Sequence, residues 1–157
     1  MSINSAKSEE SNINLFYEWA IWGHLESEKN LELILLKGHL LLEVVLDSLL
    51  FDDKKDYKNY SFHRKVTYLE NLDVKEESRQ RFIVMALRDL NKMRNKLAHE
   101  FKYDIANGEF DEWSSRIHDN LEGMKWTRYT RRTKIIHSFS ILAKNILDIK
   151  TTKASCR

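Results

Sequence analysis

Residues 82–101 read FIVMALRDLNKMRNKLAHEF, and this stretch decides the fold class of the chain. Its apolar side chains recur every three or four positions, at Phe82, Ala86, Leu90, Met93 and Leu97. Residues at this spacing lie on one face of an α-helix. The stretch therefore predicts a long amphipathic helix that begins near Val74 and ends near His99.

Helical periodicity extends over most of the remaining chain. The expected segments are a first helix around Leu15 to Trp22 that continues through Gly23 or bends there, then helices from Glu28 to Phe51, from Ser61 to Leu72, from an Asp111 cap onward and from Thr127 to Ile149. Residues 101–105 alternate apolar and polar side chains, which predicts a short extended segment before a turn at Asn107-Gly108. The chain has no proline and only four glycines, so little interrupts a helix. We expect an all-α fold, an up-and-down bundle of four to five main helices.

A chain of 157 residues fits one domain of ordinary size. We expect a single helical domain over residues 13–150, a disordered tail over residues 1–12 and a flexible tail over residues 151–157. The segment from Glu28 to Phe51 is apolar on more than one face. A helix of this kind is buried by neighbours on several sides or by a partner subunit.

Composition narrows the function classes. The formal net charge is +2, which is far from the surplus of a dedicated double-stranded DNA binder but permits contacts with RNA. Cys156 is the only cysteine, so no internal disulfide forms, and the N-terminus lacks the pattern of a signal peptide. Residues 31–51 form the longest apolar stretch, but they include too many charged side chains to span a membrane. These features favour a cytoplasmic protein without a membrane partner.

The densest chemistry in the chain lies at the end of the long helix. Asn95 and His99 are one turn apart and share a face, whereas Arg94 is about 140° around the helix from His99. Imidazole is the side chain that exchanges protons near neutral pH, and guanidinium is a planar cation that binds phosphate. These residues either form a site or are ordinary polar residues at a helix end.

The sequence from Arg94 to His99 resembles the Arg-x4–6-His motif of HEPN domains, including the polar residue after the arginine and the small residue before the histidine. This resemblance implies a HEPN-like helical bundle and a metal-independent endoribonuclease, with no cofactor, in which two subunits bring the motif together across a homodimer interface. His99 would then act as general acid or base on single-stranded RNA, Arg94 would hold the scissile phosphate, and Asn95 would orient either. The family also implies a toxin or antiviral defence effector, with an antitoxin or regulatory protein as a possible partner.

One departure and one alternative accompany the resemblance. Some HEPN toxins carry a tyrosine two residues after the histidine, where this chain has Phe101, so restraint by modification of that tyrosine is in doubt. The segment from Gly38 to Glu43, together with the motif, also resembles mannitol-repressor-like regulators. In that case the face that carries the arginine and the histidine binds a nucleotide, a nucleic acid or a partner protein without cutting.

Further residues are candidates for RNA contact or for a metal site. The candidates for RNA contact are Lys92 and Lys96 on the long helix and Arg128, Arg131 and Arg132 in a basic run that includes aromatic residues. The histidines outside the motif are scattered at spacings unlike those of zinc sites, so we expect no metal site.

Overall fold

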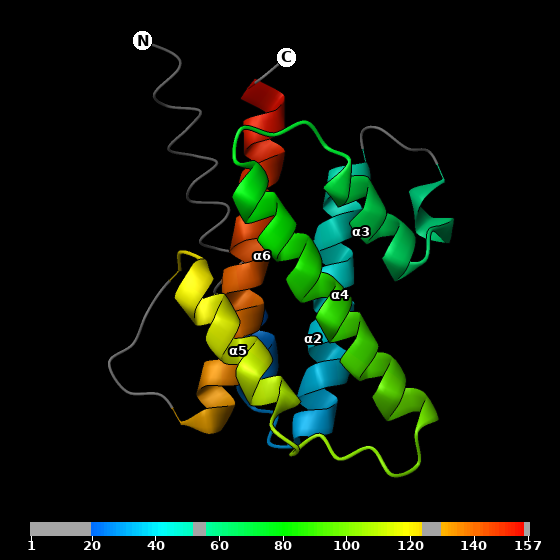
Figure 1. The fold of residues 1–157 in the computed structure, drawn as a ribbon, viewed down its shortest axis with the longest axis vertical. Coiled ribbons are helices and arrows are strands. Elements are labelled where there is room, and N and C mark those ends of the chain that lie inside the picture. Colours follow the sequence, from blue (N-terminus) through cyan, green and yellow to red (C-terminus); the bar gives the residue numbers. More distant parts are fainter. Residues whose placement is uncertain (1–19, 52–55, 124–129, 156–157) are drawn as a thin grey trace.

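The computed structural model describes residues 20–51, 56–123 and 130–155, with side chains as far as Ile149. Its elements are α2 (Leu31–Leu50), the 3-10 turn η1 (Tyr57–Asn59), α3 (Phe62–Glu70), α4 (Glu77–His99), α5 (Glu109–Asn120) and α6 (Arg131–Ser155). Residues 20–25 are also helical and end a turn before α2 (Figure 1). The predicted all-α fold is confirmed, and the described part of the chain contains no strand.

Two helices, α2 and α3, begin at capping residues that the sequence supplies. Asn30 caps α2 by accepting backbone hydrogen bonds from Glu32 and Leu33, and Ser61 caps α3 through its hydroxyl, as predicted. The first helical segment passes through Gly23 and ends at Leu25, so it does not run on into α2. The predicted tail over residues 1–12 lies outside the described residues.

Other boundaries differ from the prediction. Residues 101–107 form successive turns, in which the backbone N–H of Tyr103 donates to Glu100 and that of Asn107 to Asp104, so the predicted extended segment is wrong. A short alternating segment forms a strand only when another strand pairs with it, and the described residues contain no such strand. Helix α5 begins at Glu109 rather than at Asp111, because Gly108 adopts a positive φ of 103° and turns the chain into the helix. Helix α6 continues past residue 150 to Ser155.

Helices α2 and α6 pack face to face in the middle of the bundle. At their closest approach Gly38 of α2 faces the ring of Phe139, where a side chain of any size would overlap the ring. Phe139 also lies 5.0 Å from Trp113 of α5, and the indole N–H of Trp113 donates to the carbonyl of Ala86 in α4 at 2.9 Å. This aromatic cluster fixes α4 and α5 against the central pair.

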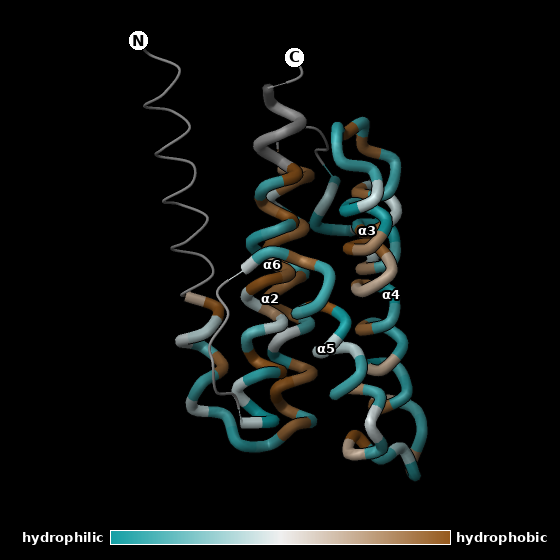
Figure 2. The backbone as a smooth tube through the Cα atoms, turned by 60° about the vertical axis from the view of Figure 1, so that its left-hand side comes forward, coloured by the Kyte–Doolittle hydropathy of each residue, from teal (hydrophilic) through white to brown (hydrophobic). Residues whose placement is uncertain are grey.

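Hydropathy is distributed as this packing requires. Much of α2 and α6 is hydrophobic, whereas the C-terminal half of α4 is largely hydrophilic along its outer side (Figure 2). The predicted apolar stripe of α4 lies inward, since Ala86, Leu90 and Met93 are buried. Within the described residues, no helix is both long and apolar enough to cross a membrane.

Candidate functional site

The C-terminal half of α4 and the first turn of α3 enclose an open groove of about 550 Å³. We call it the α3–α4 groove; it is lined by His63, Arg88, Asn91, Lys92, Asn95, Lys96, His99 and Glu100. The six residues that α4 supplies up to His99 recur every three or four positions, so they form one face of that helix. The predicted pair of Asn95 and His99 is exposed in this groove, one helical turn apart.

The floor of the groove is held from inside the bundle. The amide oxygen of Asn91 accepts a hydrogen bond from Nε2 of buried His39 at 3.1 Å, and the His39 ring stacks on Phe62 with centroids 4.1 Å apart. Burial lowers the pKa of His39, and nearby Arg94 lowers it further, against the opposing effect of the Asn91 hydrogen bond. A neutral imidazole is thus built into the support of the groove.

Arg94 does not line the groove. It is half-buried on the side of α4 toward α2, where its charge acts on His39. Its guanidinium donates to the amide oxygen of Asn95 at 3.1 Å, which brings it to the edge of the groove. The separation of Arg94 from His99 that helical geometry predicts is therefore retained in the fold, and Asn95 connects the two sides.

Two of the three cations in the groove have carboxylate partners. Arg88 forms a two-pronged ion pair with Glu70 of α3, and Lys96 contacts Glu109 of α5 at 2.7 Å. Within the described residues, exposed Lys92 makes no ion pair, so it is the groove cation best able to bind an incoming anion. Through this contact Lys96, which is also predicted to contact RNA, connects α4 to the start of α5.

The same carboxylate holds the loop after His99. The hydroxyl of Tyr103 donates to Glu109 at 3.2 Å, and burial together with this carboxylate raises the pKa of Tyr103 to about 12. The hydrogen bond with Lys96 lowers the pKa of Glu109. Phe101, in contrast, is fully exposed two residues after His99. The loop therefore presents one free aromatic ring beside a fixed backbone.

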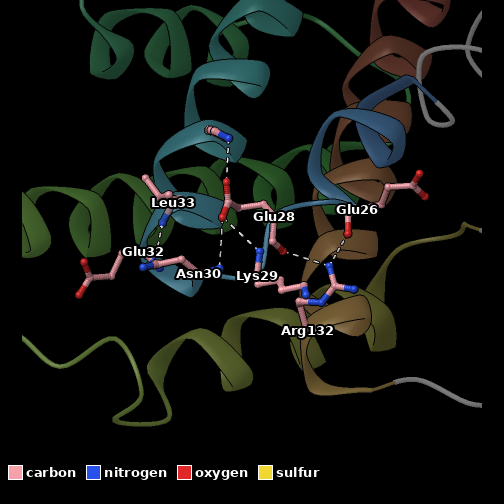
Figure 3. A network of polar contacts seen from close by, with 8 residues as sticks. Glu26, Glu28, Lys29, Asn30, Glu32, Leu33 and Arg132 are labelled. Carbon is pink, nitrogen blue, oxygen red and sulfur yellow. Dashed lines mark hydrogen bonds and ion pairs between the residues drawn. The ribbon is translucent and has the colours of Figure 1, made fainter.

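The basic run near α6 is used for internal contacts where the structure describes it. Arg131 forms a two-pronged ion pair with Asp111, with both contacts at 2.7 Å. Arg132 donates to the carbonyl oxygens of Glu26 and Glu28 and fastens the turn before α2 (Figure 3). Arg128, the third arginine predicted to contact RNA there, lies outside the described residues.

His63 is the groove residue whose role was not predicted from the sequence. It lies at the start of α3, 36 positions before His99, and is exposed in the same groove. The amphipathic pattern of α3 places it on the outer side, but periodicity within one helix gives no register between two helices. Its place in the same groove as His99 depends on the packing of α3 against α4.

No group of metal-binding side chains occurs among the residues that the structure describes. Comparisons of the chain with models of protein families, with curated proteins and with solved structures find no match. The function of the chain is therefore inferred from the groove itself.

Proposed function

We propose that this chain is a metal-independent endoribonuclease that cleaves single-stranded RNA in the α3–α4 groove, and that it acts in the cytoplasm as a homodimer. The observation that supports this proposal most directly is the pair of exposed imidazoles, His63 and His99, in one open groove with Asn95 and Lys92. Imidazole is the side chain that most often serves as general acid or base, so a pair of imidazoles beside an amide and a cation suits the cleavage of a phosphodiester.

The proposed reaction uses the 2′-hydroxyl of the RNA as nucleophile. One imidazole removes the proton of this hydroxyl while its oxygen bonds to phosphorus, and the bond from phosphorus to the 5′-oxygen breaks. The second imidazole, in its protonated form, gives a proton to that leaving oxygen. The products are a 2′,3′-cyclic phosphate and a free 5′-hydroxyl, and the proton count is balanced without a metal ion. His99 and His63 are the two imidazoles that the groove offers for these steps.

The remaining residues bind and orient the phosphate in this proposal. Asn95 lies between His99 and Arg94, since it shares the groove with the first and accepts a hydrogen bond from the second. Its amide NH2 remains able to donate to a phosphate oxygen. Arg94 at the edge of the groove offsets charge on that phosphate, and Lys92 attracts the RNA backbone.

The test is cleavage of an unstructured oligoribonucleotide by the purified chain in excess EDTA. We expect fragments that end in a 2′,3′-cyclic phosphate, and we expect His99→Ala to abolish their formation while circular dichroism stays unchanged. His24→Ala is the matched control, because His24 is also exposed but lines a different cavity. A wild-type chain that leaves the RNA intact would refute the nuclease proposal.

The placement of Arg94 favours a second candidate, a regulatory module that binds a nucleotide or nucleic acid without cutting it. Arg94 does not line the groove with His99; its guanidinium donates to Asn95 at the edge of the groove, and its charge lowers the pKa of His39. In that case the wild-type chain binds labelled RNA or nucleotide, the ligand stays intact, and His99→Ala weakens binding without affecting any reaction. Growth arrest on expression, relieved by His99→Ala, would instead support the nuclease as a toxin or defence effector.

A further inference from the structure

Four large apolar side chains form a straight line on the outer face of α2, which we call the α2 stripe. They are Leu33, Leu40, Val44 and Phe51, with 41%, 61%, 64% and 69% of their surface exposed. At about 100° per residue, their spacings of 7, 4 and 7 keep all four within about 40° of rotation. Single exposed apolar residues are ordinary, but a line along a whole helix is typical of an interaction surface.

The other faces of α2 already have neighbours within the chain. Gly38 packs against Phe139 of α6, and His39 stacks on Phe62 of α3. Within the stripe, Phe51 contacts the ring of Tyr57 in η1 edge-on at 6.2 Å, whereas Leu33, Leu40 and Val44 remain exposed beyond these inner contacts. Since α2 has 20 residues, the stripe extends over about 30 Å, which is long enough for a helix-to-helix interface.

The stripe is symmetric about residue 42. Leu40 and Val44 lie two positions on either side of this centre, and Leu33 and Phe51 lie nine positions on either side. A second α2 that runs antiparallel about a twofold axis at residue 42 would therefore set each apolar residue against an apolar residue. This self-complementarity is what an interface between two identical subunits requires.

The charges beside the stripe favour the same antiparallel register. Lys37 and Asp47 lie five positions on either side of residue 42, so each lysine is level with an aspartate of the second copy. A parallel arrangement would instead place like charges level with each other. Within the chain Lys37 contacts Glu28 and Asp47 contacts Lys65, both at 2.8 Å. Lys37 and Asp47 lie on opposite flanks of the stripe, so the antiparallel register sets unlike charges diagonally across the seam, where a parallel one would set like charges.

We infer that a second copy of this chain binds the α2 stripe, with the two α2 helices antiparallel and centred on residue 42. Leu40 then packs against the partner's Val44. An apolar hollow of about 510 Å³ beside Val44 and Phe51 receives side chains from the second α2. This inference rests on the surface of α2 and not on the proposed nuclease activity.

The inferred interface also has a consequence for the α3–α4 groove. Helices α3 and α4 lie on one flank of the stripe, as the contacts of His39 with Asn91 and of Lys65 with Glu43 and Asp47 show. A twofold axis through the centre of the stripe maps each flank onto the same flank of the dimer. The two grooves therefore open on one face of the dimer, where a single RNA strand can reach both.

The mass of the full chain in solution is the first test. We expect light scattering after size-exclusion chromatography to give twice the 18.8 kDa mass of one chain. Leu40→Glu should convert the protein to monomer while its helicity stays unchanged. Met85→Glu is the matched control, because Met85 is an exposed apolar residue on α4 outside the stripe. A monomeric wild-type chain would overturn the inference. The surface that covers the stripe would then have to come from residues 1–19 or from another protein.

Disulfide trapping tests the register. In chains that carry Cys156→Ser, we expect Leu40→Cys and Val44→Cys chains to crosslink when they are mixed and oxidised, as should Leu33→Cys with Phe51→Cys. Each variant alone should crosslink far less, because identical positions lie level only in a parallel pair. Efficient crosslinking of Leu40→Cys with itself would overturn the antiparallel arrangement. RNA cleavage is not used in these measurements, so failure of the nuclease proposal would leave them intact.

Discussion

The α3–α4 groove and the α2 stripe are both helix surfaces that the described chain leaves open, but they are built from opposite chemistry. The groove presents imidazoles, amides and cations at one end of α4, and its floor is fixed by buried His39. The stripe presents large aliphatic side chains and one aromatic ring along α2. Polar groups exposed in a groove can be matched by a charged ligand, whereas exposed apolar side chains gain free energy only when another apolar surface covers them. This difference is the reason that we propose a charged ligand for the groove and a protein partner for the stripe.

The largest effect that we expect concerns the two histidines of the groove. His63→Ala should lower the rate of RNA cleavage about 100-fold or more, because a positioned proton donor or acceptor contributes 10²–10⁴-fold. The pH–rate profile should lose one of its two limbs, while the mass in solution should equal that of wild type because His63 is outside the α2 stripe.

A nucleotide ester with a p-nitrophenol leaving group identifies which histidine is the acid. This leaving group needs no proton, so the variant that lacks the general acid should regain most of its rate, and the variant that lacks the base should not. If His63→Ala retains the wild-type rate and profile on RNA, His63 has no part in the reaction and the groove contains a single working imidazole.

The next largest effect concerns the two sides of α2. Gly38→Ala should lower the free energy of unfolding by about 1–3 kcal/mol, because the added methyl group overlaps the ring of Phe139. Gly23→Ala is the matched control, since none of the described residues lies within 4 Å of a methyl group there. Urea unfolding measures both variants. Equal free energies of unfolding for Gly38→Ala and wild type would show that α2 and α6 pack less tightly than described. The inner face of α2 would then differ less from its exposed stripe.

Buried histidines should make the fold sensitive to acid. Burial lowers the pKa of His39, and burial together with His118 lowers that of His137 to about 4. Below the usual value of 6.5 the unfolded chain therefore binds protons that the folded chain does not, so stability is lost as the pH falls from about 7 toward 4. We expect the free energy of unfolding to drop by about 1–2 kcal/mol between pH 7.5 and 5.0, measured by urea unfolding.

A variant separates this effect from general acid denaturation. His137→Phe keeps an aromatic ring against Trp22, on which His137 stacks at 4.1 Å, but removes the titrating group. Its stability should depend less steeply on pH than that of wild type over this range. If the free energy of unfolding of His137→Phe depends on pH as steeply as that of wild type, groups other than His137 bind the protons.

Sequence reasoning was most successful where one helix determines the answer. The apolar stripe of α4, the cap at Ser61 and the shared face of Asn95 and His99 follow from spacing within a single segment. It could not give contacts between helices, such as Lys96 with Glu109, because helical periodicity contains no information about the angle or register at which two helices meet.

The two open surfaces illustrate the same limit. His63 joins His99 only through the packing of α3 on α4, so the sequence left it among scattered histidines. The wide apolar arc of residues 28–51 correctly indicated several neighbours for α2, which α3, α4 and α6 provide. Which part of that arc stays uncovered could be known only once those neighbours were placed.

The smallest effect concerns Lys92, the groove cation without an ion pair within the described chain. Lys92→Ala should weaken binding of a labelled oligoribonucleotide roughly threefold to tenfold at low salt, and should reduce the slope of log affinity against log salt by about 0.7. Fluorescence anisotropy over a NaCl series measures both quantities, in a His99→Ala background so that the RNA stays intact. Lys75→Ala is the matched control, because Lys75 is exposed just before the opposite end of α4. Equal salt slopes for the two lysine variants would mean that RNA does not bind along the C-terminal half of α4. The groove could then no longer be contrasted with the α2 stripe as a ligand-binding surface.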